Sequence, residues 1–560
     1  MKVSDYVIKF LEGITDSVFL LSGGHIMHLV DSLRKSRLNV YCCHHEQAVT
    51  IAAEGYARIK NSLGVAIVTA PGGPNAVTGI TGAWLDSIPL IVIAGQVKRD
   101  NITPRKDGIP LTRQVGFQEV NLIDIVKPIT KYAVTVKKEE DIRYHLEKAV
   151  YLAKSGRPGP VLVEIPLDIQ GSVDNKTGEI NPKKLRSFTP PANSEFSTAK
   201  IPIKLIVKKI EKAKKPLLFV GNGVRLAGGE KTLWKLIRKM KINVITPIFT
   251  ADDLVTDEYP YYLGRQGIPG NYAANYAVDN CDLLLIIGER LQLTQTSFDY
   301  QNFAKQAIKI MVDIDKNELD KKTINIDIPV CCDAKLFLEK LSEQKIILNR
   351  WDINVKDIQP KDYKGKKKYV NVYSFLEKLS KFSKKNHIAT ANGMASVATH
   401  QALKIARGQR FITNAGLGNM GSGLPLAIGA SIANQKKTVI CMEGDGSIML
   451  NIQELQTVVH HHLPLKIFIF NNNGYYSIKV THMKFFKKIF AANPKTGVSL
   501  PDFEKIANAW GIKYFKISRD EELQKLKNVI DHKGPVICEL MLDPDQPMLS
   551  KWSAGKFKKN

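Results

Sequence analysis

The sequence predicts an α/β protein with three doubly wound parallel-sheet domains. Two observations predict this class. Short apolar runs alternate with amphipathic helical stretches along most of the 560 residues, and the runs fall into three blocks that polar, lysine-bearing segments separate. Strands joined by helical crossovers pair in parallel, because each crossover returns the chain to the same end of the sheet. The expected domains cover residues 1–170, 196–345 and 369–548.

Each block supplies its own set of strands. The first contains VFLLSG, GVAIVTA, PLIVIAGQ and GPVLVEIP, and residues 171–195 after it are polar and proline-bearing, which indicates a linker. The second contains PLLFVGNG, INVITPI, DLLLIIGER and IKIMVDID. The third contains ATANG, TVICMEG, KIFIFNN and VICELML.

Composition excludes several classes of protein. An apolar fraction of 44% and a charged fraction of 24% are ordinary for a globular chain. The net charge of +26 raises the question of nucleic acid, but the lysines are dispersed, with local density only at 364–368 and 556–560, and we found no aromatic platforms among basic residues. No apolar run reaches about 18 residues and no signal peptide is evident. The seven cysteines show no C-x-x-C spacing. We expect a cytoplasmic protein without nucleic-acid or membrane partners.

A candidate metal and diphosphate site lies in the third block. The run 438–447 is expected to form a strand that ends at Gly444-Asp445-Gly446-Ser447 and leads into a helix over IMLNIQELQTVVHH, with the amides of Gly446 and Ser447 facing an anion. A second strand ends at Asn472. Oxygen atoms from Asp445, Asn472 and the carbonyl of Gly474 are hard ligands that suit Mg²⁺. Alternatively, the motifs are simply a turn and a polar strand end.

A candidate catalytic acid lies near the start of the chain. In YCCHHEQAVTIAAEGYAR (41–58), a short strand precedes a helix that carries Glu46 in its first turn, where a carboxylate is well placed to be buried. The alternative is a surface acid that the helix dipole stabilises.

Together these segments resemble the thiamine-diphosphate enzymes, in which a GDG motif is followed by NN. Long matches such as HHEQAVTIAAEGYAR, GFQEVNLIDIVKPITKY and GDGSIMLNIQELQTV are similar to the acetolactate-synthase-like branch. The resemblance implies that Glu46 hydrogen-bonds N1′ of the cofactor, that the carbonyl of Gly418 accepts a bond from its 4′-amine, and that Met420 holds it bent. It also assigns cofactor contacts to Gly446, Ser447, Asn392, Gly393, Gly474 and Ile478.

The resemblance further implies a reaction and an assembly. A 2-keto acid such as pyruvate would lose CO₂, and the two-carbon unit would be protonated, oxidised or added to a second carbonyl. Gln118 would contact the bound substrate, Phe117 would shape the acceptor side, and the turn at Gly23 and Gly24 would open space for the reaction. Each site would lie between two subunits, which implies a dimer or tetramer.

Departures from the family pattern bear on the substrate. The family's pocket-restricting tryptophan is replaced by Thr481, which favours an acceptor larger than pyruvate. Relatives with SIK-like sequence after NN, and with SGGxxMHL near the start, resemble enzymes of surface-polysaccharide pathways. These attach a two-carbon unit to a nucleotide-linked keto sugar, and we expect this activity. The alternatives are acetolactate synthesis, simple decarboxylation and a catalytically silent regulator.

The second block contains segments placed like a flavin site. They are GNGVRLAGG (221–229), GRQGIPGN (264–271), GERLQLTQT (288–296) and DID (313–315). Arg290 is retained, but the residues after it differ from the family pattern. FAD is therefore possible, and the alternative is a domain that acts only as a scaffold.

Overall fold

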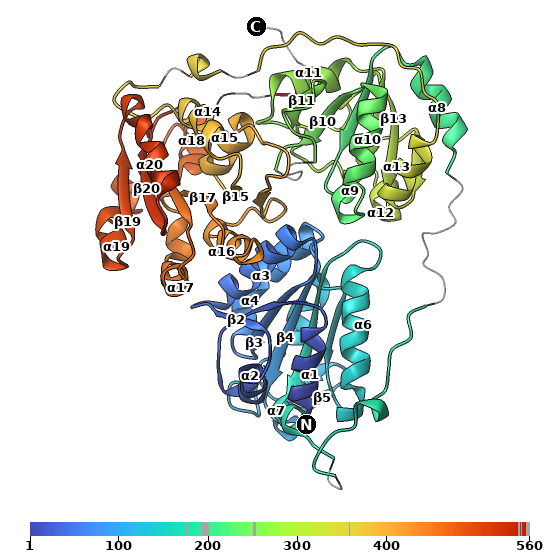
Figure 1. Ribbon diagram of the computed structural model, residues 1–560, viewed down its shortest axis with the longest axis vertical. Coiled ribbons are helices and arrows are strands. Elements are labelled where there is room, and N and C mark those ends of the chain that lie inside the picture. The colour runs from blue at the N-terminus through green and yellow to red at the C-terminus, as the bar shows by residue number, and fades with distance from the viewer. Residues whose placement is uncertain are drawn as a thin grey trace.

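The computed structural model describes residues 1–174, 177–191, 201–249, 254–357, 359–363, 365–546, 549 and 552–555 (Figure 1). The expected domain limits at 196 and 548, parts of the expected linker, and the lysines at 364 and 556–560 lie outside these residues. Among the residues described, no helix is long and apolar enough to cross a membrane.

The N-terminal domain, blue to cyan in Figure 1, is built on a six-stranded parallel sheet in the order β2-β1-β3-β4-β8-β7. Its strands are β1 (Ser17–Leu20), β2 (Asn39–Cys42), β3 (Gly64–Thr69), β4 (Leu90–Gln96), β7 (Tyr132–Thr135) and β8 (Pro160–Pro166). Its helices are α1 (Val3–Glu12), α2 (Met27–Arg34), α3 (Glu46–Lys60), α4 (Gly73–Leu85), α5 (Leu122–Val126), α6 (Ile142–Lys154) and α7 (Leu167–Gly171). The hairpin β5 (Arg105–Lys106) and β6 (Ile109–Pro110) extends from the loop after β4.

The central domain, green in Figure 1, has a second six-stranded parallel sheet in the order β11-β10-β9-β12-β13-β14. Its strands are β9 (Pro216–Val220), β10 (Asn243–Pro247), β11 (Tyr262–Gln266), β12 (Leu283–Ile287), β13 (Ile308–Asp313) and β14 (Ile328–Cys331). Its helices are α8 (Ile203–Lys212), α9 (Gly223–Leu226), α10 (Glu230–Met240), α11 (Tyr272–Asn280), α12 (Lys316–Asp320) and α13 (Ala334–Ser342).

The C-terminal domain, orange to red in Figure 1, has a third six-stranded parallel sheet in the order β16-β15-β17-β18-β20-β19. Its strands are β15 (His387–Thr390), β16 (Phe411–Thr413), β17 (Val439–Gly444), β18 (Lys466–Asn471), β19 (Lys513–Ile517) and β20 (Val536–Met541). Its helices are α14 (Val372–Phe382), α15 (Met394–Ala402), α16 (Gly423–Ala433), α17 (Leu455–His460), α18 (Tyr476–Phe485), α19 (Phe503–Ala509) and α20 (Leu526–Asp531).

The predicted fold class is confirmed, and the central sheet differs in topology from the other two. The first and third sheets share one strand order, whereas the central sheet follows the order of dinucleotide-binding folds. Strands such as β3, β4 and β8 are buried along their whole length, because helices cover both faces of a parallel sheet. In such sheets, ligands bind at the carboxyl ends of the strands, where the strand order reverses.

Helices α3 and α16 join the N-terminal and C-terminal domains (Figure 1). Their contact depends on small residues: a Cβ on Gly55 would lie 2.4 Å from the carbonyl oxygen of Leu426, and one on Gly429 would lie 1.9 Å from that of Ala52. One continuous apolar core contains side chains from both domains. Because α3 begins at Glu46, this packing also fixes the candidate catalytic acid.

The expected helix after the GDG motif is wrong in detail. Two 3-10 turns, Ile448–Leu450 and Ile452–Glu454, precede the short helix α17. Asn451 interrupts the helix with a φ of −138°, because its side-chain amide donates to the carbonyl of Gly421 at 2.7 Å. The hydroxyl of Ser447 accepts from the amide of Gly421 at 2.8 Å. The segment is therefore tied to the glycine-rich loop rather than wound as one helix.

Candidate functional site

Asp445 and Asn472 lie side by side at the carboxyl edge of the third sheet. Asp445 follows β17 and Asn472 follows β18, and the two strands are neighbours. One oxygen of the buried Asp445 carboxylate accepts from the amide of Gly446 at 2.7 Å. The other accepts from the amides of Asn472 and Gly474, both at 3.0 Å. These bonds hold the two strand ends together around one carboxylate.

A buried lysine that the sequence analysis did not identify, Lys479, places a positive charge near Asp445. Burial raises the pKa of Asp445 to about 6, against the opposing effects of the Gly474 and Gly446 amides and of Lys479. Lys479, on α18, is itself buried and donates to the carbonyl of Asn472 at 2.7 Å. Its only sequence cue is its place in the first turns of the helix after the NN motif.

A cavity of about 250 Å³ opens at this edge. Besides Asp445 and Asn472, it is lined by seven of the eight expected cofactor-binding residues: Asn392, Gly393, Met420, Gly446, Ser447, Gly474 and Ile478. The eighth, Gly418, accepts a hydrogen bond at its carbonyl from the side-chain amide of Asn392. The structure therefore places seven of the eight residues around one cavity, although they come from separate parts of the third block.

Three glycines of the set, among them Gly393 with a φ of +75°, have backbone conformations that side chains disfavour. Gly418 has a φ of +62°. Gly474 has a φ of +120°, and a Cβ there would lie 2.2 Å from the carbonyl oxygen of Ala492. A larger residue would strain the backbone at either position, and at Gly474 it would also clash with the neighbouring chain.

The side-chain oxygens present at this edge fit a hard divalent cation. The amide oxygen Oδ1 of Asn472 is buried without a hydrogen-bond partner, which is costly unless a ligand satisfies it. No cluster of three or more His, Cys, Asp and Glu side chains suited to a metal occurs in the described residues. A cation here would therefore take one carboxylate and keep most of its shell for other oxygens, as Mg²⁺ does.

The expected anion contacts of Gly446 and Ser447 need correction. The amide of Gly446 donates to Asp445, and that of Ser447 donates to the carbonyl of Gly444 at 3.1 Å. Neither amide faces outward at a regular helix N-terminus, because the helix expected there is replaced by 3-10 turns. Both residues still line the cavity.

The four expected catalytic residues lie at the carboxyl edge of the first sheet. Gly24 follows β1, Glu46 follows β2, and Phe117 and Gln118 lie in the long loop after β4. Glu46 is buried and accepts from the side-chain amide of Asn75 at 3.0 Å. Phe117 is 82% exposed, and Gln118 is exposed with a φ of +64°. None of the four lines the 250 Å³ cavity.

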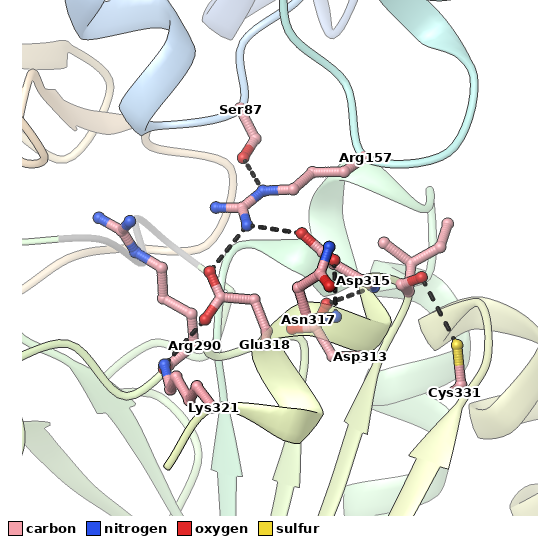
Figure 2. Close-up of polar contacts among 10 residues, drawn as sticks. Ser87, Arg157, Arg290, Asp313, Asp315, Asn317, Glu318, Lys321 and Cys331 are labelled. Atoms are coloured by element: carbon pink, nitrogen blue, oxygen red, sulfur yellow. Dashed lines mark hydrogen bonds and ion pairs between the residues drawn. The ribbon is translucent and has the colours of Figure 1, made fainter. Parts of the chain in front are cut away.

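A second cavity, of about 320 Å³, lies where the central domain meets the N-terminal domain. Figure 2 shows Arg157 reaching from the N-terminal domain to α12. Its guanidinium donates to Ser87 at 2.9 Å, Asp315 at 3.1 Å and Glu318 at 2.8 Å. Lys321 pairs with the other oxygen of Glu318 at 2.8 Å. Burial alone would raise the pKa of Glu318, but the two cations hold it below its ordinary value.

The residues of this cavity do not fit the dinucleotide that the family pattern places here. The amides of Gly221 and Gly223 already donate to the carbonyls of Ile287 and Gly288, both at 2.9 Å. A Cβ on Gly223 would lie 2.7 Å from the Cα of Gly288, so the glycines serve close packing of two strand ends. Phosphate groups therefore find no free amide cradle at these two glycines, and we derive no step through a flavin.

The fold defines a three-domain α/β protein with a polar cavity at the carboxyl edge of its third sheet, and the comparisons with known proteins give the same three domains. Residues 391–540 match the thiamine pyrophosphate enzyme C-terminal TPP binding domain, 203–341 match the central domain, and 1–125 match the N-terminal TPP binding domain.

Whole-chain relatives give the same family. The chain is 33% identical to the acetolactate synthase isozyme 2 large subunit of Escherichia coli, over 94% of this chain and 93% of the relative. It is 31% identical to the acetolactate synthase large subunit of Cyanidium caldarium, over 96% and 93% respectively. It is 32% identical to a probable acetolactate synthase large subunit of Methanocaldococcus jannaschii, over 98% and 93%. The chain belongs to the thiamine pyrophosphate enzymes related to acetolactate synthase.

Proposed function

We propose that this enzyme is a carboligase that decarboxylates a 2-keto acid such as pyruvate. It transfers the two-carbon acyl unit to a carbonyl acceptor larger than pyruvate, such as a nucleotide-linked keto sugar. The observation that carries the proposal is the cavity at the third sheet, where a buried carboxylate and an unpartnered amide oxygen meet in a TPP binding domain.

In this proposal the C-terminal domain holds the cofactor. Asp445, Asn472 and the carbonyl of Gly474 would hold Mg²⁺, which would supply positive charge for the diphosphate. Gly418 and Met420 orient the ring portion. Thiamine diphosphate, when bound, supplies the electron sink that allows a 2-keto acid to lose CO₂.

A second copy of the chain completes the site in this proposal. No residue of the first sheet lines the cavity, although Glu46 is the acid that must share a proton with N1′ of the cofactor. The loop that carries Phe117 and Gln118 exposes large apolar side chains, including Ile109 and Leu111, as an unpartnered surface does. A partner subunit would bring this loop and Glu46 over the cavity, so that Gln118 contacts the substrate.

The proposed binding site for the acceptor lies beside the first turns of α18. Ser477 and Ile478 line the cavity, and Thr481 lies one turn beyond Ser477, on the same face of the helix. The Thr481 hydroxyl donates to the Ser477 carbonyl at 2.9 Å, so this side chain is short and folded back. The space that a larger residue would fill is left for an acceptor.

Acetolactate synthesis is the second candidate, because the relatives named above are acetolactate synthases. The test is incubation of the protein, supplied with thiamine diphosphate and Mg²⁺, with ¹³C-pyruvate and a panel of ketone acceptors. Product NMR is expected to show label in a branched sugar. Label only in acetolactate would establish the second candidate, label only in acetaldehyde a simple decarboxylase, and no turnover by the cofactor-bound protein a silent regulator.

A further inference from the structure

The segment from Ile478 to Ala492 leaves the cofactor cavity and returns to it. Ile478 lines the cavity near the start of α18. After the helix, the chain turns back so that the carbonyl of Ala492 accepts from the amide of Tyr475 at 2.9 Å. The same carbonyl oxygen is the atom that a Cβ on Gly474 would meet first. Both ends of the segment are therefore held near the edge of the cavity, while its middle, after Ile478, does not line the cavity.

The middle of this segment exposes aromatic rings. Phe485 is 65% exposed, Phe486 69% and Phe490 74%. The rings of Phe485 and Phe486 lie 6.4 Å apart, and Phe486 also contacts His482 at 5.8 Å between ring centroids. Solvent-facing phenylalanines offer flat apolar surfaces on which a planar ring can stack.

Lysines alternate with these rings. Lys484, Lys487 and Lys488 are exposed, and none forms an ion pair with any residue that the structure describes. The whole stretch 473–501 contains five lysines and no aspartate or glutamate. We expected no aromatic platforms among basic residues, and that expectation is wrong for this segment. Its uncompensated positive charge favours an anion.

We propose that residues 484–490, here called the rim segment, bind the nucleoside diphosphate portion of the acceptor. The lysines would contact the diphosphate, and the phenylalanines would stack on the base. Phe485 lies seven positions after Ile478 on α18, which is about 10 Å along the helix axis. That length lets the sugar carbonyl reach the cavity while the base rests on the rim. This inference rests on the proposed function and specifies its acceptor.

Direct binding tests the proposal without turnover. The protein saturated with thiamine diphosphate and Mg²⁺ is titrated calorimetrically with ADP, CDP, GDP and UDP, and with uridine and inorganic pyrophosphate. We expect at least one nucleoside diphosphate to bind more tightly than either fragment, with an affinity that falls as salt rises. The triple variant Lys484→Ala/Lys487→Ala/Lys488→Ala should weaken that affinity by about 10- to 100-fold.

Matched variants separate the contributions. Lys381→Ala/Lys384→Ala/Lys385→Ala removes the same charge at the end of α14 and should leave affinity unchanged. Phe485→Ala/Phe486→Ala should weaken nucleoside diphosphates while leaving pyrophosphate unaffected. With a nucleotide-linked keto sugar as acceptor, the rim variants should raise its KM while the KM for pyruvate stays constant.

The other outcomes overturn the proposal. Undiminished nucleotide affinity in the rim variants would place the nucleotide elsewhere. A changed oligomeric state in light scattering would make the segment a subunit contact, and preferential binding of a single-stranded oligonucleotide would assign it to nucleic acid. Proton exchange at C2 of the cofactor in D₂O is followed for every variant. If the wild-type protein lacks exchange, the proposed function fails, whereas normal exchange with unchanged nucleotide binding refutes only the rim segment.

Discussion

The C-terminal and central domains each have a cavity where the strand order of a parallel sheet reverses. The two cavities differ in whether their buried polar atoms have hydrogen-bond or ion-pair partners. At the C-terminal sheet, the side-chain oxygen of Asn472 is buried and unpartnered beside the Asp445 carboxylate. At the central sheet, Arg157 pairs with Asp315 and Glu318 (Figure 2). The amides of Gly221 and Gly223 there donate to backbone carbonyls. Unpaired buried groups indicate a ligand, whereas paired ones indicate a structural contact.

The largest expected effect is a loss of cofactor affinity when the carboxylate of the C-terminal cavity is removed. Removing a carboxylate from the central cavity is the control. Asp445→Ala should weaken Mg²⁺-dependent thiamine diphosphate binding on the order of a hundredfold, because a buried charged ligand contributes about 3 kcal/mol. Asp313→Ala, in the central cavity, is the matched control and should leave that affinity unchanged. Calorimetry measures both. Equal losses in the two variants would mean that the cavities do not differ in function.

The acceptor side of the C-terminal cavity gives the next effect. Thr481→Trp should lower kcat/KM for large acceptors by about tenfold or more, because the indole would fill space beside Ser477. Small keto acids should still react, and Thr481→Ser should behave like the wild-type protein. Competition between the two acceptors in one reaction provides the measurement. A parallel loss of both activities would show that position 481 does not select the acceptor.

A substitution in the central cavity should change the stability of the protein rather than its cofactor binding or activity. Arg157→Ala leaves Asp315 and Glu318 without their partner and should destabilise the contact between the first two domains by about 1–3 kcal/mol. Thermal unfolding measures this loss, and thiamine diphosphate affinity should stay constant. The purified protein should show no flavin absorbance at about 450 nm. A flavin spectrum would show that a dinucleotide binds in the central cavity despite the ion pairs of Arg157.

The smallest effect is a pH dependence at the junction of the central and C-terminal domains. His400 is buried between the rings of Phe249 and Phe411, and burial lowers its pKa to about 3. In the unfolded chain the His400 imidazole takes up a proton below about pH 6.5, whereas in the folded chain it stays neutral there. The free energy of unfolding therefore decreases as the pH falls below that value. His400→Gln should reduce the drop in melting temperature between pH 7 and pH 5. Identical drops would exclude this origin.

Much of the fold and the C-terminal site could be predicted from sequence, because both depend on local patterns. Asp445 and Asn472 follow apolar strands, and parallel pairing places such strand ends at one edge. Three features had no local cue. The ion pairs of Arg157 join residues more than a hundred positions apart, the Asn451 bond to Gly421 that breaks the expected helix depends on tertiary contact, and Lys479 has a surface-like sequence context but is buried.

The central claim is that Glu46 of one subunit and Asp445 of another act on the same cofactor. Mixing is the most direct test: Glu46→Ala and Asp445→Ala chains are each expected to lack C2 proton exchange, and refolding or co-expressing them together should restore it. In a random dimer mixture, about a quarter of the sites would carry both residues. Recovery near that fraction, measured by deuterium exchange into thiamine diphosphate, is the predicted result. No recovery in demonstrably mixed dimers would contradict the account.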